Sequence, residues 1–286
     1  MSFRQQIFSG LYLPFKTVKS IGRFLGIVSP ESLRVLLYHD IPPNQQEHFA
    51  AQLRWLARSW NFVSAVEFGE MMSGNRPIKG RNLLLTFDDG FASNRVVAEK
   101  ILNPMRIPAL FFVVSGFAEL DNFNTAQHFI SDNILPGTPV TELPDHLYNM
   151  NWNDLSALLE QGHTIGAHTA NHKKLTQLDT DEERTGEIIT SANRISTKLG
   201  VPIEHFAYTF GDINSIDKKA LAVTRTRFKF VYSGIRGSNT KDVSPFAIRR
   251  DAIAPQNSVS QLGSFVEGLS DPYYMADRKK IDDLVQ

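Results

Sequence analysis

Short apolar runs alternate with amphipathic stretches along most of the chain. The runs have the length of strands and cover residues 33–38, 82–87, 109–114 and 164–167. Such a run is typical of a strand buried on both faces, as in a parallel sheet. Apolar residues at helical spacing cover residues 46–59, 65–72, 93–102, 151–161 and 181–199. Repeated strand–helix units predict an α/β fold with a mostly parallel sheet.

The remaining parts of the chain give weaker signals. We expect a short strand at residues 62–64 and later strands at 206–210, 228–232 and 246–250. Residues 121–149 fit neither period and contain Pro136, Pro139 and Pro144. A loop of that length inside a compact domain is usually functional or mobile. We therefore predict an insertion beside the active face, as a lid or as a wall for the substrate.

Two adjacent carboxylates, Asp88 and Asp89, follow the apolar run at 82–87, and Gly90 then supplies a turn. An ionised aspartate is almost never fully buried unless it is paired or bound to a metal. Two carboxylates side by side repel each other, so this pair needs a proton, a cation or open solvent. The alternative is a turn that caps the next helix.

A histidine pair, His168 and His172, follows the predicted strand at 164–167. Histidines four residues apart project to the same side of a helical turn, which suits two imidazoles on one metal. The alternative is two surface histidines. Together with the aspartate pair, they offer three metal ligands and one spare carboxylate. Three protein ligands with an open fourth position form the catalytic rather than the structural arrangement.

Several stretches in order along the chain resemble the polysaccharide deacetylase family, carbohydrate esterase family four. They are VLLYHDI at 35–41, LLTFDDG at 84–90, IPALFFV at 107–113, the segment 152–172, and FAYTFG at 206–211. The first is similar to the branch that includes biofilm exopolysaccharide deacetylases. The resemblance covers roughly residues 33–255 and implies a distorted (β/α)₇ barrel, whose catalytic face lies at the C-terminal ends of the strands.

The resemblance also implies an activity. We expect a metal-dependent hydrolase that removes N-acetyl groups from an amino sugar in a polysaccharide or glycan precursor and releases acetate. One alternative is a deacylase acting on an O-acetyl ester or a non-sugar amide. The other is a carbohydrate-binding barrel that has lost activity.

The family pattern assigns the ligands and the base. Asp89, His168 and His172 would hold a divalent metal, and Asp88 would be the general base. Zinc suits this set of oxygen and imidazole ligands, with cobalt, nickel and iron as alternatives. From the residues alone, the two aspartates could not be told apart.

A general acid is also required, because an amide nitrogen leaves poorly without a proton. Many relatives take this acid from a Leu-x-His motif near the C-terminus, but this chain has no histidine after His205. In the branch that the chain resembles, the histidine of the first strand fills the role, which here is His39. The alternative for His39 is a core histidine beside Asp40.

The third family motif departs from the usual pattern, because Ala207 stands where an arginine is common and Thr209 where a proline is common. We expect the backbone N–H of Phe210 to face the oxyanion, with Tyr208 in the same substrate site. Arg250 is a candidate to orient Asp88 by its charge. The alternative for Arg250 is a solvated arginine at a strand end.

Composition excludes some classes of protein. Lysine plus arginine and aspartate plus glutamate both number 30, so no bulk charge favours nucleic acid as a partner. The absence of cysteine excludes disulfides, thiolate zinc sites and cysteine nucleophiles. A cysteine-free chain tolerates both redox environments, so its compartment stays open.

Residues 1–28 form a segment distinct from the catalytic domain that we predict at 29–286. Basic residues there alternate with aromatic and aliphatic ones, and the longest nearly apolar piece, 7–15, is too short to span a bilayer. Secretion is not supported by a clear signal peptide. Residues 1–27 fit an interfacial helix with peripheral membrane contact, or a helix docked on the barrel. We expect a location that is cytoplasmic or peripheral to the membrane.

Overall fold

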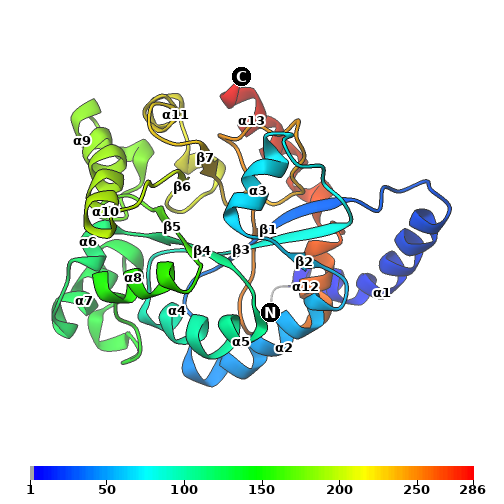
Figure 1. Cartoon of the computed structure of the whole chain (residues 1–286), viewed down its shortest axis with the longest axis horizontal. Helices are drawn as coiled ribbons and strands as arrows, with labels where there is room; N and C mark the ends of the chain where they lie inside the picture. Colours follow the sequence, from blue (N-terminus) through cyan, green and yellow to red (C-terminus); the bar gives the residue numbers. More distant parts are fainter. Residues whose placement is uncertain (1–2) are drawn as a thin grey trace.

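A parallel sheet organises the chain in the computed structural model, which describes residues 3–286, with side chains from residue 10 onward. The strands are β1 (Ser32–Tyr38), β2 (Asn61–Phe62), β3 (Arg81–Phe87), β4 (Ala109–Val113), β5 (Thr164–Ala167), β6 (His205–Ala207), β7 (Phe230–Tyr232) and β8 (Asp251–Ala252). Their order is β7-β6-β5-β4-β3-β1-β8, with β2 beside β3 (Figure 1), and these pairings are parallel. The four predicted apolar strands are therefore confirmed.

The segment that leads into β8 brings the two edges of the sheet together. Ile248 bridges Tyr232 of β7, while Asp251 and Ala252 pair with β1. The sheet thus curls into the distorted barrel that we predicted, with an irregular seam. The strand predicted at 246–250 is placed too early, because this segment crosses from β7 to β1 and only its end joins a ladder.

Both faces of the strands are buried, as the largely apolar runs predict. In β3, Leu84 belongs to an inner cluster with Val35, Leu110 and Phe68. Its neighbours on the other face belong to the larger cluster between sheet and helices. Phe68 comes from α3 (Ala65–Met72), which begins with a Ser64–Glu67 capping box.

Helices surround the sheet in Figure 1. Besides α3, they include α1 (Phe3–Phe24), α2 (Gln46–Ala57), α4 (Ala92–Val97), α8 (Trp152–Glu160), α9 (Asp181–Thr185), α10 (Ser191–Leu199), α11 (Lys218–Arg225), α12 (Val259–Val266) and α13 (Met275–Val285). The predicted helices at 93–102 and 181–199 each contain a π-helical turn, at Ala98–Leu102 and Gly186–Thr190.

The predicted insertion at 121–149 is more regular than its sequence suggests. It follows α6 (Ser115–Ala118) and contains α7 (Phe123–Phe129), a π turn (Ile130–Ile134) and a 3₁₀ turn (Val140–Glu142). Our reading of this segment as lacking regular structure is therefore wrong. The Asn122 side chain caps α7, and Phe117, Ile130 and Leu147 belong to a separate small core that stabilises it.

Helix α1 packs along α12, beside it in Figure 1. Tyr12 is buried against Gly263, and Lys19 and Arg23 pair with Glu267. Met1 and Ser2 of the predicted N-terminal segment lie outside the described residues. Within residues 3–286, no helix has both the length and the hydropathy that a membrane span requires.

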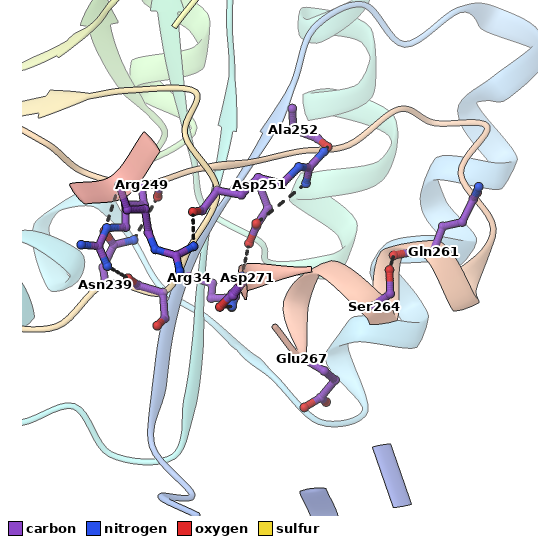
Figure 2. Close-up of polar contacts among 12 residues, drawn as sticks. Arg34, Asn239, Arg249, Asp251, Ala252, Gln261, Ser264, Glu267 and Asp271 are labelled. Carbon is purple, nitrogen blue, oxygen red and sulfur yellow. Dashed lines mark hydrogen bonds and ion pairs between the residues drawn. The ribbon is translucent and has the colours of Figure 1, made fainter. Parts of the chain in front are cut away.

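An ion-pair network braces the seam from outside the barrel. Figure 2 shows Arg34 of β1 between Asp251 of β8 and Asp271. The Arg34–Asp251 distance is 2.7 Å, and Asp251 is fully buried. Burial raises the pKa of Asp251, although Arg34 and Arg236 oppose the shift. The network fixes the register of β8, and therefore the position of Arg250 next to it.

Candidate active site and metal centre

One cavity at the C-terminal rim of the barrel collects side chains that follow different strands. It measures about 310 Å³. The predicted site residues that line it are His39, Asp88, Asp89, His168, His172, Tyr208, Phe210 and Arg250. Leu135 of the insertion also lines it. The fold therefore brings together every site residue that the sequence predicted.

Asp89, His168 and His172 present ligand atoms that all lie within 4.8 Å of one another. Asp89 Oδ1 is 3.5 Å from His168 Nε2 and 3.4 Å from His172 Nε2. This oxygen is buried and accepts no hydrogen bond from the described residues. Such an oxygen is costly to bury, and a cation between the three ligand atoms would satisfy it. The donor set thus fits a divalent metal.

Backbone carbonyls orient both imidazoles. Nδ1 of His168 lies 2.8 Å from the carbonyl oxygen of Ala207, and Nδ1 of His172 lies 2.9 Å from that of Asn133. Because a carbonyl only accepts, each Nδ1 carries the proton and donates it. In the neutral form of each ring, the Nε2 lone pair would then point toward Asp89. Metal-binding histidines usually have their second nitrogen fixed in this way.

The same residues influence each other's ionisation. Burial alone would raise the pKa of Asp89, but His168 and His172 outweigh it and hold its pKa well below its usual range. Burial alone would lower the pKa of His172, but contact with Asp89 outweighs it and raises its pKa. Deprotonation of His172 would therefore accompany binding of a metal at this position.

Strained backbone is concentrated at this rim. Among the described residues, five that are not glycine have positive φ, and four of them belong to the site: Asp89 (74°), Thr169 (64°), His172 (57°) and Phe210 (63°). Conformations of this kind cost about 1–3 kcal/mol each and persist only where the surroundings enforce them. Two of the three ligand residues are thus held in conformations that an unconstrained loop would avoid.

Residues 168–172 do not form the helical turn that the histidine spacing predicts, so that prediction is wrong. The positive φ angles break any helix there, and Glu187 braces the loop instead. Its Oε2 accepts hydrogen bonds from the backbone N–H groups of Ala170 (3.1 Å) and Asn171 (2.8 Å), and its Oε1 accepts one from the Asn171 side chain (2.7 Å). The two imidazoles therefore converge through a loop rather than through a helix face.

Arg250 anchors Asp88 next to the ligand group. Nη1 and Nη2 of Arg250 lie 2.7 and 2.9 Å from the two carboxylate oxygens of Asp88, and Nε donates to the carbonyl oxygen of Ser233 at 2.8 Å. Arg250 is only 1% exposed, so the alternative of a solvated arginine is wrong. Asp88 Oδ2 lies 3.9 Å from His168 Nε2. Both oxygens of Asp88 are thus engaged beside the candidate metal ligands.

His39 lies at the mouth of the cavity and is exposed, unlike the core histidine that was the alternative. Its carbonyl oxygen accepts a hydrogen bond from Asn94 Nδ2 at 2.8 Å, which fixes the backbone. The neighbouring Asp40 is paired with His146 Nε2 at 2.9 Å. His39 therefore lines the cavity and forms no ion pair with a carboxylate among the residues whose side chains are described.

The loop after β6 contributes Phe210. Its N–H donates to no acceptor among the described residues, and its ring lies 4.9 Å from that of His172. Tyr208 differs, because its N–H donates to Tyr232 and its hydroxyl lies 3.3 Å from that of Thr224. Phe210 can thus offer a donor to a ligand, whereas the polar groups of Tyr208 are already paired.

Sequence reasoning did not identify Glu187 or Asn133, which support the loop and the ring of the candidate metal ligands. Glu187 is 7% exposed and lies beside the buried stripe of Ile188, Ala192 and Ile195. An acidic residue at the edge of an apolar helix face is a signal that could have identified it. Asn133 acts through its carbonyl oxygen, and therefore leaves no signal in the sequence.

Comparison with known proteins identifies the family. Residues 75–227 match the family model for polysaccharide deacetylases, which is 153 of the 286 residues. The chain belongs to the polysaccharide deacetylase family. The family that the sequence motifs suggested is confirmed, and the protein is a carbohydrate deacetylase by membership.

Individual relatives are distant. YxkH of Bacillus subtilis, whose name places it among the polysaccharide deacetylases, is 20% identical over 246 residues, covering 84% of this chain and 78% of YxkH. IcaB from Ammonifex degensii is 21% identical with a TM-score of 0.65, covering 83% of this chain and 97% of IcaB. The Streptococcus pyogenes deacetylase PplD, solved with acetate, is 20% identical with a TM-score of 0.65, covering 83% and 99%. These structures share the barrel fold.

Proposed function

We propose that this deacetylase is a metal-dependent hydrolase that removes N-acetyl groups from an amino sugar in a polysaccharide or glycan precursor and releases acetate. One observation carries the proposal: Asp89, His168 and His172 converge on a common point, while the adjacent Asp88 is held beside them by Arg250. A ligand group with a spare oriented carboxylate suits hydrolysis better than a purely structural metal site.

The proposed metal ligands are Asp89, His168 and His172. Zinc is our first choice, and cobalt, nickel and iron suit the same ligands. When bound, a divalent metal would polarise the acetyl carbonyl and acidify a water molecule.

Asp88 is the proposed general base. It would accept the proton of the attacking water, because its carboxylate is fixed by two hydrogen bonds from Arg250 and borders the ligand group. The N–H of Phe210 would donate to the oxygen that gains negative charge in the tetrahedral transition state.

His39 is the proposed general acid. His39 lines the cavity, and a protonated imidazole can act as a general acid. It would donate a proton to the departing amine, which leaves a free amino group on the sugar.

The decisive experiment is a mass-spectrometric screen for exchange of an acetyl group for hydrogen. The substrates are N-acetylglucosamine oligomers, O-antigen fragments and lipid-linked sugars, each with the metal-loaded enzyme and with Asp88→Asn. Loss of acetyl from amino positions by the native enzyme alone would support the proposal. Loss from O-acetyl esters alone would favour the esterase alternative. A metal-free protein that binds glycans without releasing acetate would favour the binding barrel.

We also propose that residues 29–286 form the catalytic domain and that residues 1–27 contact a membrane surface. In α1, the basic residues Lys19 and Arg23 face the barrel, whereas Val18, Ile21 and Phe24 are 70%, 54% and 90% exposed. Helix α1 can therefore dock on α12 with one face and contact a membrane with the exposed side chains of Val18, Ile21 and Phe24. Flotation with vesicles should retain the full chain and release Phe24→Ser, while equal behaviour of both would contradict the proposal.

A further inference from the structure

A second cavity lies on the same rim, outside the catalytic cavity. It measures about 610 Å³ and is lined by residues 118–123, 148, 149 and 151–154. We call it the rim cavity. Its volume falls within the range of about 300–1,000 Å³ that small-molecule sites occupy, and the chemistry described above does not use it.

The topology places the rim cavity at the catalytic end of the barrel. Helix α6 begins directly after β4, at the C-terminal end of that strand. Helix α8 leads into the N-terminal end of β5, so the first residues of α8 lie at the opposite end, where the strands have their C-termini. Tyr148 and Asn149 line the rim cavity, and the chain at this point is hydrogen-bonded to the segment that carries Asp89. Met150 N donates to Gly90 O at 2.8 Å, and Asn149 forms a bridge with Phe91. The insertion thus borders both cavities, because Leu135 lines the catalytic one.

Two exposed aromatic rings distinguish the rim cavity. Phe123 is 47% exposed and Tyr148 is 44% exposed, with ring centroids 6.4 Å apart and planes inclined at 59°. Two other aromatic residues nearby are ordinary packing. Phe129 stacks on Phe117 in the small core. The exposed rings of Phe123 and Tyr148, by contrast, offer apolar faces on which the C–H faces of sugar rings can stack.

The polar groups between these rings suit a ligand rich in hydroxyl groups. Asn122 and Asn151 use their Oδ1 atoms to cap α7 and α8, so their side-chain NH₂ groups remain as donors. Three carboxylates add acceptors: Asp121, Asp154, which already accepts from the N–H of Asn151, and Glu119, which pairs with Arg194 and Lys198. No lysine or arginine is among the described residues that line the cavity. Trp152 Nε1 is buried without an acceptor among the described residues. Amide donors, carboxylate acceptors and aromatic faces, with no basic residue in the lining, favour a neutral glycan over a phosphorylated one.

We propose that the rim cavity is a second carbohydrate-binding site, which holds one part of a glycan polymer while a more distant acetamido group occupies the catalytic cavity. The choice of a glycan as ligand rests on the proposed function. The new content is the second binding site itself, in which Phe123 and Tyr148 recognise the length of the glycan.

The test uses the full-length, metal-loaded enzyme with the dimer and the hexamer of N-acetylglucosamine. Binding is measured by calorimetry and KM by acetate release. The Phe123→Ala/Tyr148→Ala variant should bind the hexamer about tenfold more weakly, which corresponds to about 1.4 kcal/mol. Its kcat and its affinity for the dimer should be unchanged. Both rings are exposed, so folding should be preserved.

Two variants serve as controls. Tyr148→Phe keeps the ring and should behave as the native enzyme. Tyr273→Ala removes an exposed aromatic ring beyond α12, at the opposite end of the barrel, and should also leave hexamer affinity unchanged.

Three results would overturn the inference. They are equal hexamer affinity in the native enzyme and the double variant, equal loss for dimer and hexamer, and a native enzyme that binds no hexamer. Failure of the proposed function gives a different pattern. The native enzyme would then bind the hexamer through Phe123 and Tyr148 and yet release no acetate.

Discussion

Replacing Arg250 with lysine tests whether the guanidinium keeps Asp88 in place as the base. Arg250 donates two parallel hydrogen bonds to Asp88, at 2.7 and 2.9 Å, and a third to the carbonyl oxygen of Ser233 at 2.8 Å. Lysine keeps the charge, but its ammonium on a flexible stem cannot reproduce this planar geometry. A hydrogen bond to a charged group contributes about 1.5–3 kcal/mol. With one or two such bonds lost at a buried site, we expect the free energy of unfolding to fall by about 3 kcal/mol.

The effect on activity should exceed the effect on folding, because Asp88 would no longer be oriented. General base catalysis contributes roughly 10²–10⁴-fold, so we expect Arg250→Lys to lower kcat by about 10²-fold while the metal content stays unchanged. Asp88→Asn keeps the shape of the side chain but cannot accept a proton. It should lose most of its turnover and also retain the metal. The measurements are acetate release, elemental analysis and denaturant unfolding.

A double-mutant cycle decides whether Arg250 acts through Asp88. In the Asp88→Asn background, Arg250→Lys should lower kcat no more than about twofold, because residues that act as a unit are strongly non-additive. The matched control is Arg249→Lys, since Arg249 pairs with Asp282 outside the cavity. If the cycle showed the full loss from Arg250→Lys in both backgrounds, the arginine would act on another group and our account of the base would be refuted.

Three further predictions concern histidines. His168→Ala and His172→Ala should each lose metal and activity together by more than the 10–100-fold typical of supporting residues, and full metal occupancy in either would contradict the ligand assignment. His39→Ala should keep its metal and lose the alkaline limb of the pH profile of activity. It should hydrolyse an activated ester far better than an amide, because a good leaving group needs no proton. An equal loss of activity on the ester and on the amide would indicate a structural histidine. Burial lowers the pKa of His205 to about 4. Since the unfolded chain takes up this proton near pH 6.5, the contribution of His205 to stability is complete above about pH 6.5. It falls by about 3 kcal/mol as the pH drops to about 4. Denaturant unfolding of His205→Asn should show a flatter dependence over this range, and an unchanged slope would contradict the argument.

The fold was predictable because its central strands are largely apolar. β1, β3, β4 and β5 are buried on both faces, so each produces a run of mostly apolar residues in the sequence. The seam was less predictable, because β8 has two residues and its neighbouring segment is shared between two edges of the barrel. In the insertion, α7 is set by its Asn122 cap and by contacts with the small core. Contacts of this kind are not visible in a local pattern.

The candidate site was predictable only where residue type carries the chemistry. Asp88, Asp89, His168 and His172 could be identified because paired carboxylates and histidines have few other uses at strand ends. The contacts that support these residues could not be identified from the sequence. Glu187 reaches the histidine loop from a separate helix, and Asn133 supports His172 through a carbonyl group that every residue possesses.

The Phe210 loop shows how this chain compensates for a departure from the family motif. Phe210 has a φ of 63°, which favours glycine or asparagine, and the residue before it is Thr209 where a proline is common. The Thr209 hydroxyl donates to the carbonyl oxygen of Lys173 at 2.7 Å, a bond that proline could not make. Lys173 directly follows His172, and the Phe210 ring also packs on His172. The donor proposed for the oxyanion and a proposed metal ligand are thus joined by two contacts. Thr209 therefore ties the two halves of the proposed site together, and the strain at Phe210 is offset by bonds that also position His172.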